Sequence, residues 1–182
     1  SNDRILVYFS GHGMTEDLPD GGEIGYLIPV DGEYDDLFTT SIAMRELKHV
    51  AHMTEAKHLL YLIDACYGGI SGIRTKGAYI ETITEEKSRQ IITAGGRSEA
   101  VIEKSEWGHS AFTLNLLRGL RLFMADLNSD GFITAEELGS FLKLRVTIDS
   151  DGQQTPQVRR FTSDMGEFIF LIPSIIKSKV LD

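Results

Sequence analysis

The stretch that decides the fold is Lys57-His-Leu-Leu-Tyr-Leu-Ile-Asp-Ala-Cys66, an apolar run that ends abruptly at polar residues. Its apolar residues follow one another instead of alternating with polar ones, which is typical of a strand buried on both faces. Such strands belong to parallel sheets that helices cover on both sides. The stretch therefore predicts a parallel strand over Lys57–Ile63 whose carboxyl end carries Asp64 and Cys66.

Outward from this strand, the chain alternates between further strands and amphipathic helices. We expect strands over 3–10, 25–29, 89–94 and 167–172, a helix capped by Thr40 or Ser41 that runs to Met53, and helices over 110–125 and 135–146. This alternation predicts an α/β domain with a mostly parallel sheet. Because the first strand begins only two residues into the chain, we expect further strands of the same domain upstream of Ser1.

The composition is that of an ordinary globular domain, with 42% hydrophobic residues among 182. The net charge of −9 argues against a nucleic-acid partner, which would need a basic surface. No apolar run approaches the roughly 18 residues of a membrane span, and no signal peptide opens the chain. The single cysteine excludes a disulfide framework and suggests a reducing, cytoplasmic location.

The negative charge is concentrated between Gly13 and Met44. This segment has no Lys or Arg, and the rest of the chain has 19 acids against 18 bases. The segment contains eight acids: Glu16, Asp17, Asp20, Glu23, Asp31, Glu33, Asp35 and Asp36. One interpretation is a solvated acidic loop. The other is an electrostatic field that attracts a cationic substrate.

A histidine and the only cysteine follow two of the predicted strands. His12 and Cys66 are 54 positions apart, and each is flanked by glycine-containing turns. Carboxyl ends of parallel strands meet at one edge of a sheet, so the two side chains can meet there. An imidazole is suited to activating a thiol as a nucleophile, and main-chain amides of Gly13 and Cys66 could form an oxyanion hole. Taken singly, each residue could instead be structural.

These motifs resemble those of a known family. Ser10-Gly-His-Gly13 and Asp64-Ala-Cys-Tyr-Gly-Gly69 are similar to the His and Cys motifs of caspase-like cysteine peptidases, the clan of caspases, metacaspases and paracaspases. The resemblance continues through Tyr26–Asp31, Ile92–Gly95, Trp107–Thr113 and 155–170, and so covers essentially the whole chain. It implies a single domain over 1–182 with a caspase-like three-layer α/β/α sandwich whose N-terminal strands are missing here.

The resemblance also implies roles for individual residues. His12 would be the base and Cys66 the nucleophile of a dyad without an obligatory third acid. Asp64 stands where Asp-cleaving caspases have Gln, and in metacaspase-like and paracaspase-like relatives an acid there binds Arg or Lys of the substrate. We assign Asp31 to substrate binding as well. The alternative for Asp64 is a turn-capping carboxylate.

The segment 67–89 follows the nucleophile directly. In caspase-like relatives this region is often cut during activation, and a pocket for basic side chains would make four residues candidates for self-cleavage: Arg74, Lys76, Lys87 and Arg89. The alternative is an uncut lid.

A second motif, Asp126-Leu-Asn-Ser-Asp-Gly-Phe-Ile-Thr-Ala-Glu-Glu137, fits the twelve-position calcium loop of an EF-hand. Six residues would supply oxygen ligands: Asp126, Asn128, Asp130, Phe132 through its carbonyl, Thr134 and Glu137. The alternative is that Thr134 and Glu137 form a helix-capping box that needs no metal.

The sequence thus predicts a bacterial-type cysteine endopeptidase that acts on proteins or peptides after Arg or Lys and has no nucleic-acid or membrane partner. Its chemistry requires no cofactor, although Ca²⁺ could bind, and an upstream sensor or regulatory domain could control it. Two alternatives are a catalytically silent caspase-like binding domain and a calcium-sensing helix–loop–helix module.

Overall fold

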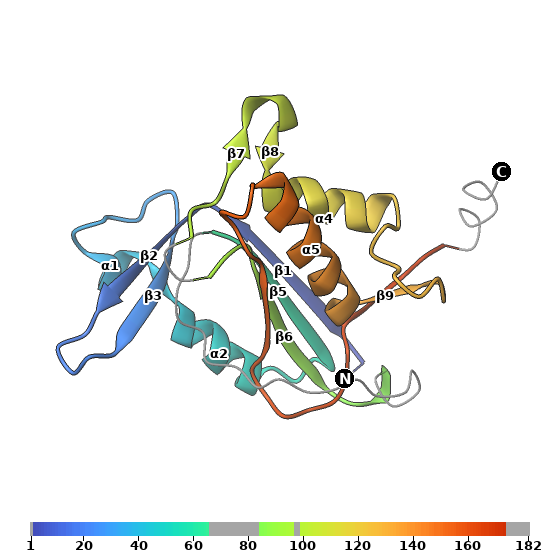
Figure 1. Ribbon diagram of the computed structural model, residues 1–182. Coiled ribbons are helices and arrows are strands. Elements are labelled where there is room, and N and C mark those ends of the chain that lie inside the picture. Colours follow the sequence, from blue (N-terminus) through green and yellow to red (C-terminus); the bar gives the residue numbers. More distant parts are fainter. Residues whose placement is uncertain (1, 66–83, 97–98, 174–182) are drawn as a thin grey trace.

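A computed structural model describes residues 2–65, 84–96 and 99–173. Its central sheet has four strands in the order β1-β5-β6-β10 (Figure 1). Their bounds are β1 Arg4–Ser10, β5 His58–Asp64, β6 Ser88–Thr93 and β10 Gln157–Arg160. The first three strands are parallel and β10 is antiparallel to β6. The prediction of a mostly parallel α/β sheet is confirmed.

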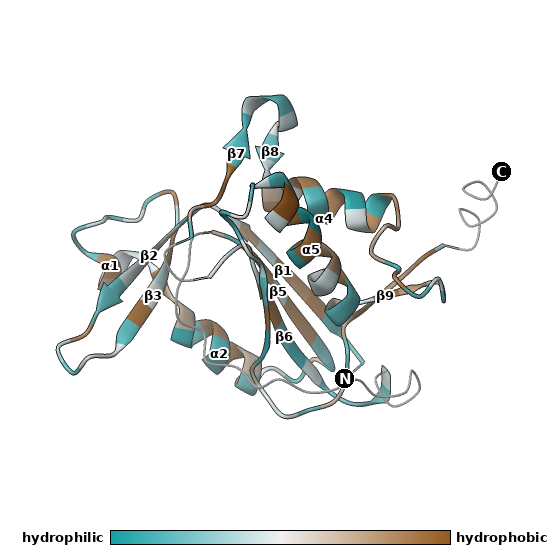
Figure 2. Cartoon of the chain, viewed as in Figure 1, coloured by the Kyte–Doolittle hydropathy of each residue, from teal (hydrophilic) through white to brown (hydrophobic). Residues whose placement is uncertain are grey.

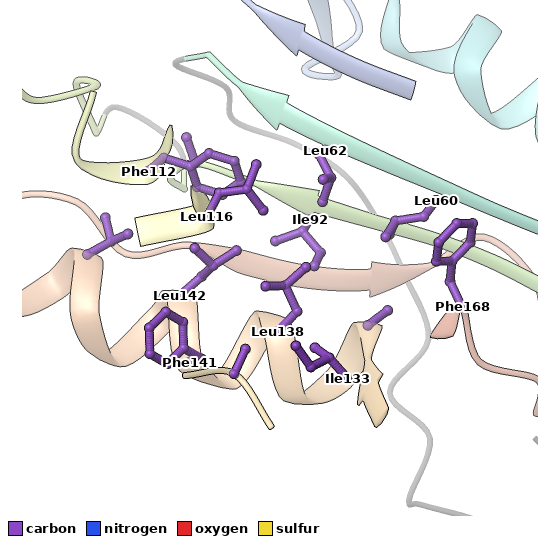
Figure 3. Packing of buried hydrophobic residues seen from close by; sticks show 14 of the residues in the cluster. Leu60, Leu62, Ile92, Phe112, Leu116, Ile133, Leu138, Phe141, Leu142 and Phe168 are labelled. Atoms are coloured by element: carbon purple, nitrogen blue, oxygen red, sulfur yellow. The ribbon is translucent and has the colours of Figure 1, made fainter. Parts of the chain in front are cut away.

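Strand β5 separates two hydrophobic layers. Leu60 and Leu62 point into a cluster with the helices α4 (Ala111–Arg121) and α5 (Ala135–Asp149), as Figure 3 shows. Leu59, Tyr61 and Ile63 point the other way, into a cluster with the helix α2 (Met44–Met53). Side chains alternate between the two faces of a strand, so this continuous apolar run fills both layers of a three-layer sandwich. In Figure 2 the central strands are accordingly hydrophobic.

Strand β1 is more exposed than its sequence suggested. It pairs with β5 and lies at the edge of the described sheet, where Leu6 and Tyr8 are 45% and 46% exposed. The prediction of a buried strand over 3–10 is therefore right in its position but wrong in its burial. An apolar run indicates strand formation, whereas burial depends on which neighbours cover it.

The first helix begins later than predicted. Neither Thr40 nor Ser41 caps α2, which begins after Ala43 without a side-chain cap. The reason is that β4 (Ile42–Ala43) stays extended to pair with β3 (Glu23–Ile28), while α1 (Leu37–Thr40) is a separate short turn of helix. The predicted apolar face is correct for Met44, Leu47 and Ala51, but Ile42 and Val50 are exposed.

Helices α4 and α5 pack against each other and the sheet. α4 is capped by Ser110, whose hydroxyl accepts from the Thr113 amide, and α5 starts with a capping box of Thr134 and Glu137. Between the helices, β9 (Phe132–Thr134) pairs with β11 (Ile169–Leu171). The strand predicted over 167–172 therefore lies outside the central sheet. The polar Gln157–Arg160 segment takes the edge position in its place.

A short hairpin precedes α4 in the chain. It consists of β7 (Glu103–Lys104), the 3₁₀ turn Ser105–Trp107 and β8 (His109–Ser110), and it projects beyond the end of the sheet (Figure 1). In the part of the chain that the structure describes, no helix combines the length and apolar character needed to cross a membrane.

Candidate active site

The carboxyl ends of β1 and β5 meet at one edge of the sheet. Ser10 is paired in register with Asp64, and the main-chain nitrogen of Gly11 donates to the carbonyl oxygen of Asp64 at 3.2 Å. This edge is where ligand sites form in open α/β sheets. The two motifs that the sequence singled out are thus neighbours through their main chains.

His12 does not lie in the tight turn predicted for it. It begins β2 (His12–Asp17), whose hairpin with β3 pairs His12 with Ile28 and Gly13 with Leu27. The His12 side chain is exposed and accessible to a substrate. Ala65, which follows β5, is fully buried and is the last described residue before Cys66.

Cys66 lies outside the described residues, as do Arg74 and Lys76. The distance between the Cys66 thiol and the His12 imidazole, and the oxyanion hole formed by the Gly13 and Cys66 amides, therefore stay predictions.

The Asp64 side chain is buried at this edge and held by two hydrogen bonds. It is 2% exposed, and its Oδ2 accepts hydrogen bonds from the hydroxyls of Ser110 and Thr113, both at 2.5 Å. Its Oδ1 is buried and has no hydrogen-bond partner among the described residues. Burial raises the pKa of the Asp64 carboxyl, the two hydroxyl donors act in the opposite direction, and Glu103 adds to the increase.

A cavity of about 530 Å³ opens beside Asp64. The ends of β1 and β5 line one side of it, and the β7–β8 hairpin with the first turn of α4 lines the other. Besides Asp64, the lining includes Tyr8, Ser10, Glu103, Lys104, His109 and Thr113. The sequence analysis named Ser10 and the segment Trp107–Thr113 only as parts of family-like motifs, and it assigned no role to Tyr8, Glu103 or Lys104.

The cation that lines this cavity already has two contacts. The Lys104 ammonium donates to the main-chain carbonyl of Asp149 at 3.3 Å and lies 4.5 Å from the centre of the Trp107 ring. Both contacts stabilise a positive charge. Lys104 is thus held by α5 and by its own hairpin, while Asp64 and Glu103 provide carboxylates to the cavity.

Asp31 is not among the residues that line this cavity. It is exposed and lies in the turn that follows β3. Of the two predicted substrate-binding acids, only Asp64 lines this cavity. The acids of the segment 13–44 lie on the β2–β3 hairpin and the exposed turns that follow it.

Arg89 is not an accessible cleavage site in this fold. It is 3% exposed within β6, and its guanidinium donates five hydrogen bonds to main-chain carbonyl oxygens of residues 51–57 and of Ser88. The prediction of self-cleavage is therefore wrong for Arg89, because its side chain is buried and donates hydrogen bonds to main-chain carbonyl oxygens inside the protein. Lys87, just before β6, is exposed and stays a candidate.

The predicted calcium loop forms an ordered turn between α4 and α5. The Asp126 carboxylate accepts from the main-chain nitrogens of Asp130 and Gly131, both at 3.1 Å, and Gly131 has a φ of 93°. Glu137 Oε2 accepts from the Thr134 amide and hydroxyl, while Glu137 Oε1 is buried without a hydrogen-bond partner among the described residues. Within the described ranges, no three His, Cys, Asp or Glu side chains are grouped as metal ligands. The observed loop thus uses Glu137 as a helix cap.

In a comparison with known protein families, residues 1–165 match the family model of the caspase domain. A comparison with curated proteins found no match. The matched region contains the edge formed by β1 and β5, the cavity beside Asp64 and both helices that pack on the sheet.

Proposed function

The chain belongs to the caspase-domain family of cysteine peptidases, and on this premise we propose that it is an endopeptidase that cleaves after Arg or Lys. The observation that carries the specificity is Asp64, a buried carboxylate beside a cavity, with one oxygen that has no hydrogen-bond partner among the described residues. A buried unpaired oxygen of this kind is costly unless a ligand pairs with it. A guanidinium or ammonium group of a substrate would provide that partner.

In the proposed reaction, the Cys66 sulfur attacks the carbonyl carbon of the scissile bond. His12 takes the thiol proton and transfers it to the nitrogen of the leaving peptide. The resulting thioester is hydrolysed by water, which regenerates the thiol and releases the new carboxyl end. Amides of Gly13 and Cys66 would stabilise the negative oxygen of the tetrahedral intermediates.

Two further features support a basic peptide substrate. Glu103 adds a second carboxylate to the cavity, and the acidic β2–β3 hairpin carries His12 itself. The field of these acids would attract positively charged peptides before they bind. In this proposal Asp31 contributes to that field, without contacting the side chain held by Asp64.

The central test compares the whole chain with its Cys66→Ala variant on fluorogenic peptides that end in Arg, Lys or Asp. We expect cleavage after Arg and Lys only, and none by the variant. Labelling by an arginyl chloromethyl ketone, followed by intact mass, should give one adduct that is absent in Cys66→Ala. A folded wild-type chain that neither cleaves nor is labelled would favour the catalytically silent binding domain.

The same protein tests self-cleavage. If the pocket accepts basic residues, fragments of the incubated wild-type chain should end at Arg74, Lys76 or Lys87, and the Cys66→Ala chain should stay intact. No fragment should end at Arg89, because its bond lies within β6. An intact wild-type chain with full peptidase activity would favour the uncut lid.

Calcium binding to the loop 126–137 is a second, separate proposal. The observation that favours it is the buried Oε1 of Glu137 at the twelfth position, which has no hydrogen-bond partner in the described part of the chain, together with amides already gathered around Asp126 at the first position. Binding would require Glu137 to leave Thr134 and turn toward the ion. Helix α5 would transmit this change, because it runs from the loop to Asp149, whose carbonyl holds Lys104.

The chain contains one tryptophan, Trp107, which lies beside Lys104. We therefore expect a calcium titration to change its fluorescence, with heat of binding in calorimetry, and Asp126→Ala to abolish both signals. Asp151→Asn, an exposed acid outside the loop, serves as the matched control. No heat and no fluorescence change at millimolar Ca²⁺ would reduce the loop to a structural turn.

A further inference from the structure

Two hydroxyl groups contact Asp64 and a third contacts one of them, and with Asp64 ionised their hydrogens have one consistent arrangement. Ser110 and Thr113 each donate to Oδ2 of the carboxylate. The Thr113 oxygen is also 2.6 Å from the Tyr8 hydroxyl. A hydroxyl has a single hydrogen, and that of Thr113 is given to Asp64, so Tyr8 must donate to Thr113. The chain of donors therefore runs from Tyr8 through Thr113 to the carboxylate.

This arrangement stabilises the ionised form of a carboxyl that burial disfavours. Burial is the largest influence and raises the Asp64 pKa, while the bonds from Ser110 and Thr113 oppose that increase. Removing one donor would therefore raise the pKa further. The Tyr8 hydroxyl acts indirectly, since a Thr113 oxygen that accepts a hydrogen bond becomes a stronger donor.

The same arrangement decides which oxygen remains available. Oδ2 is occupied by two donors, whereas Oδ1 is buried and unpartnered among the described residues. The geometry points to Thr113 and Tyr8 as positioning residues that keep Asp64 ionised and leave Oδ1 for the cationic side chain of the substrate. This inference rests on the proposed function, because it assigns Asp64 to substrate recognition.

Other titratable groups face the same cavity. Among the described residues they are Tyr8 from β1, Glu103 and Lys104 from β7, and His109 from β8. A pH profile of one protein would therefore mix several groups, whereas the difference between the wild type and a hydroxyl variant isolates the effect on Asp64.

The first test is the pH dependence of KM and kcat for an Arg-ended peptide in the whole chain. For Thr113→Val we expect the acidic rise in KM to begin at higher pH, with KM about tenfold above wild type in mildly acidic buffer and kcat nearly unchanged. Thr113→Ser keeps the hydroxyl and should restore the wild-type profile. Tyr8→Phe should shift the profile in the same direction by less.

Thr162 provides a matched control, because its hydroxyl donates to the Asp164 carboxylate at 2.8 Å and neither residue lines the cavity. Thr162→Val should leave the pH profile unchanged. If Thr113→Val does not fold, Tyr8→Phe carries the test on its own. Equal losses at every pH, or a Thr113→Ser profile like that of Thr113→Val, would overturn the inference.

A binding experiment separates this inference from the proposed function. Benzamidine, whose amidinium group resembles the end of an arginine side chain, can be titrated by calorimetry into the Cys66→Ala chain at several pH values. We expect its affinity to fall as the pH decreases. When Thr113→Val is added, this loss of affinity should begin at a higher pH. This result without any peptide cleavage would retain the inference and reject the peptidase. Absence of benzamidine binding, or binding that Thr113→Val leaves unchanged, would overturn the inference.

Discussion

The main-chain nitrogen of Gly11 donates a hydrogen bond to the carbonyl oxygen of Asp64, 3.2 Å away. This bond connects the residue before His12 with the residue two positions before Cys66. Parallel pairing of β1 with β5 places Ser10 opposite Asp64 and so brings the two motifs to one edge of the sheet. The fold thereby gives a short, rigid connection between the residue proposed as base and the carboxylate proposed to bind substrate.

Asp64→Asn should separate activity from stability. The variant keeps the shape of the side chain but removes the charge that would pair with the substrate, so we expect kcat/KM for Arg and Lys peptides to fall about 100-fold. This follows from the roughly 2–5 kcal/mol lost when one partner of a buried charge pair is removed. Steady-state kinetics provides the measurement, and a loss below threefold would exclude Asp64 from the pocket.

The stability of the same variant has a defined pH dependence. Burial raises the Asp64 pKa, so the folded wild type holds this proton more tightly than the unfolded chain does. The contribution of the Asp64 carboxyl to the free energy of unfolding is therefore greatest at low pH. It is lost as the pH rises through the raised pKa of Asp64 in the folded protein. In urea unfolding at pH 5 and pH 7.5, the wild type should lose stability relative to Asp64→Asn at the higher pH. A constant difference would contradict this prediction.

Glu103 should influence the choice between Arg and Lys. Because Oδ2 of Asp64 already accepts two hydrogen bonds, Asp64 offers one oxygen, whereas a guanidinium has five N–H donors. Glu103, on the rim of the cavity, can accept from a second nitrogen. We expect Glu103→Gln to lower the Arg-to-Lys ratio of kcat/KM by about two- to fivefold, since exposed ion pairs contribute 0.2–1 kcal/mol.

Glu106→Gln is the control for this comparison, because Glu106 is exposed on the same hairpin but does not line the cavity. The Glu103 effect should also shrink in high salt. An unchanged ratio in Glu103→Gln would show that discrimination depends on residues elsewhere.

Arg89 should be essential for stability and irrelevant to cleavage. Four of its five hydrogen bonds go to carbonyl oxygens at the end of α2 and in the connection to β5, and the fifth goes to the Ser88 carbonyl of β6. Arg89→Met would remove all five of these donated hydrogen bonds from the interior, and we expect a loss of about 3 kcal/mol or more in the free energy of unfolding. Arg159→Met, which removes an arginine of β10 that is only half-buried, should cost much less. Equal, small losses would contradict the structural role.

His58 should make the fold sensitive to mild acid. It is fully buried at the start of β5, with Nε2 3.1 Å from the Glu86 carbonyl and Nδ1 unpartnered within the described part of the chain. Burial lowers its pKa, and Arg4, Lys57 and Arg89 lower it further. The unfolded chain thus binds this proton more readily, so stability is complete above the unfolded-state pKa and falls as pH decreases below it.

Urea unfolding between pH 7.5 and pH 5.5 provides the measurement. The wild type should lose stability over this range, and His58→Gln should lose less, because it carries no titrating imidazole. His49→Gln, at an exposed position of α2, should behave like the wild type. A wild-type slope that His58→Gln retains would assign the pH sensitivity to other groups.

Several structural features could be predicted from local patterns in the sequence. The uninterrupted apolar run of β5 predicted a strand buried on both faces, and the structure places its alternate residues in two core clusters. The capping box of Thr134 and Glu137 was equally local, because it depends on residues three positions apart. The start of α2 could not be predicted from local sequence, because Ile42 and Ala43 pair with β3 and stay extended although the pattern favours a helix there.

By itself, the sequence determined the family, the parallel strands that hold Asp64, and the adjacency of the His12 and Asp64 motifs, because all of these follow from short motifs and hydrophobic runs. Only the tertiary structure decided that Ser110 and Thr113, 46 and 49 positions from Asp64, bind its carboxylate. It also decided that Arg89 is an interior donor. The physical reason is that a polar contact between distant residues depends on how a helix packs on a sheet, and such contacts leave no periodic pattern in the sequence.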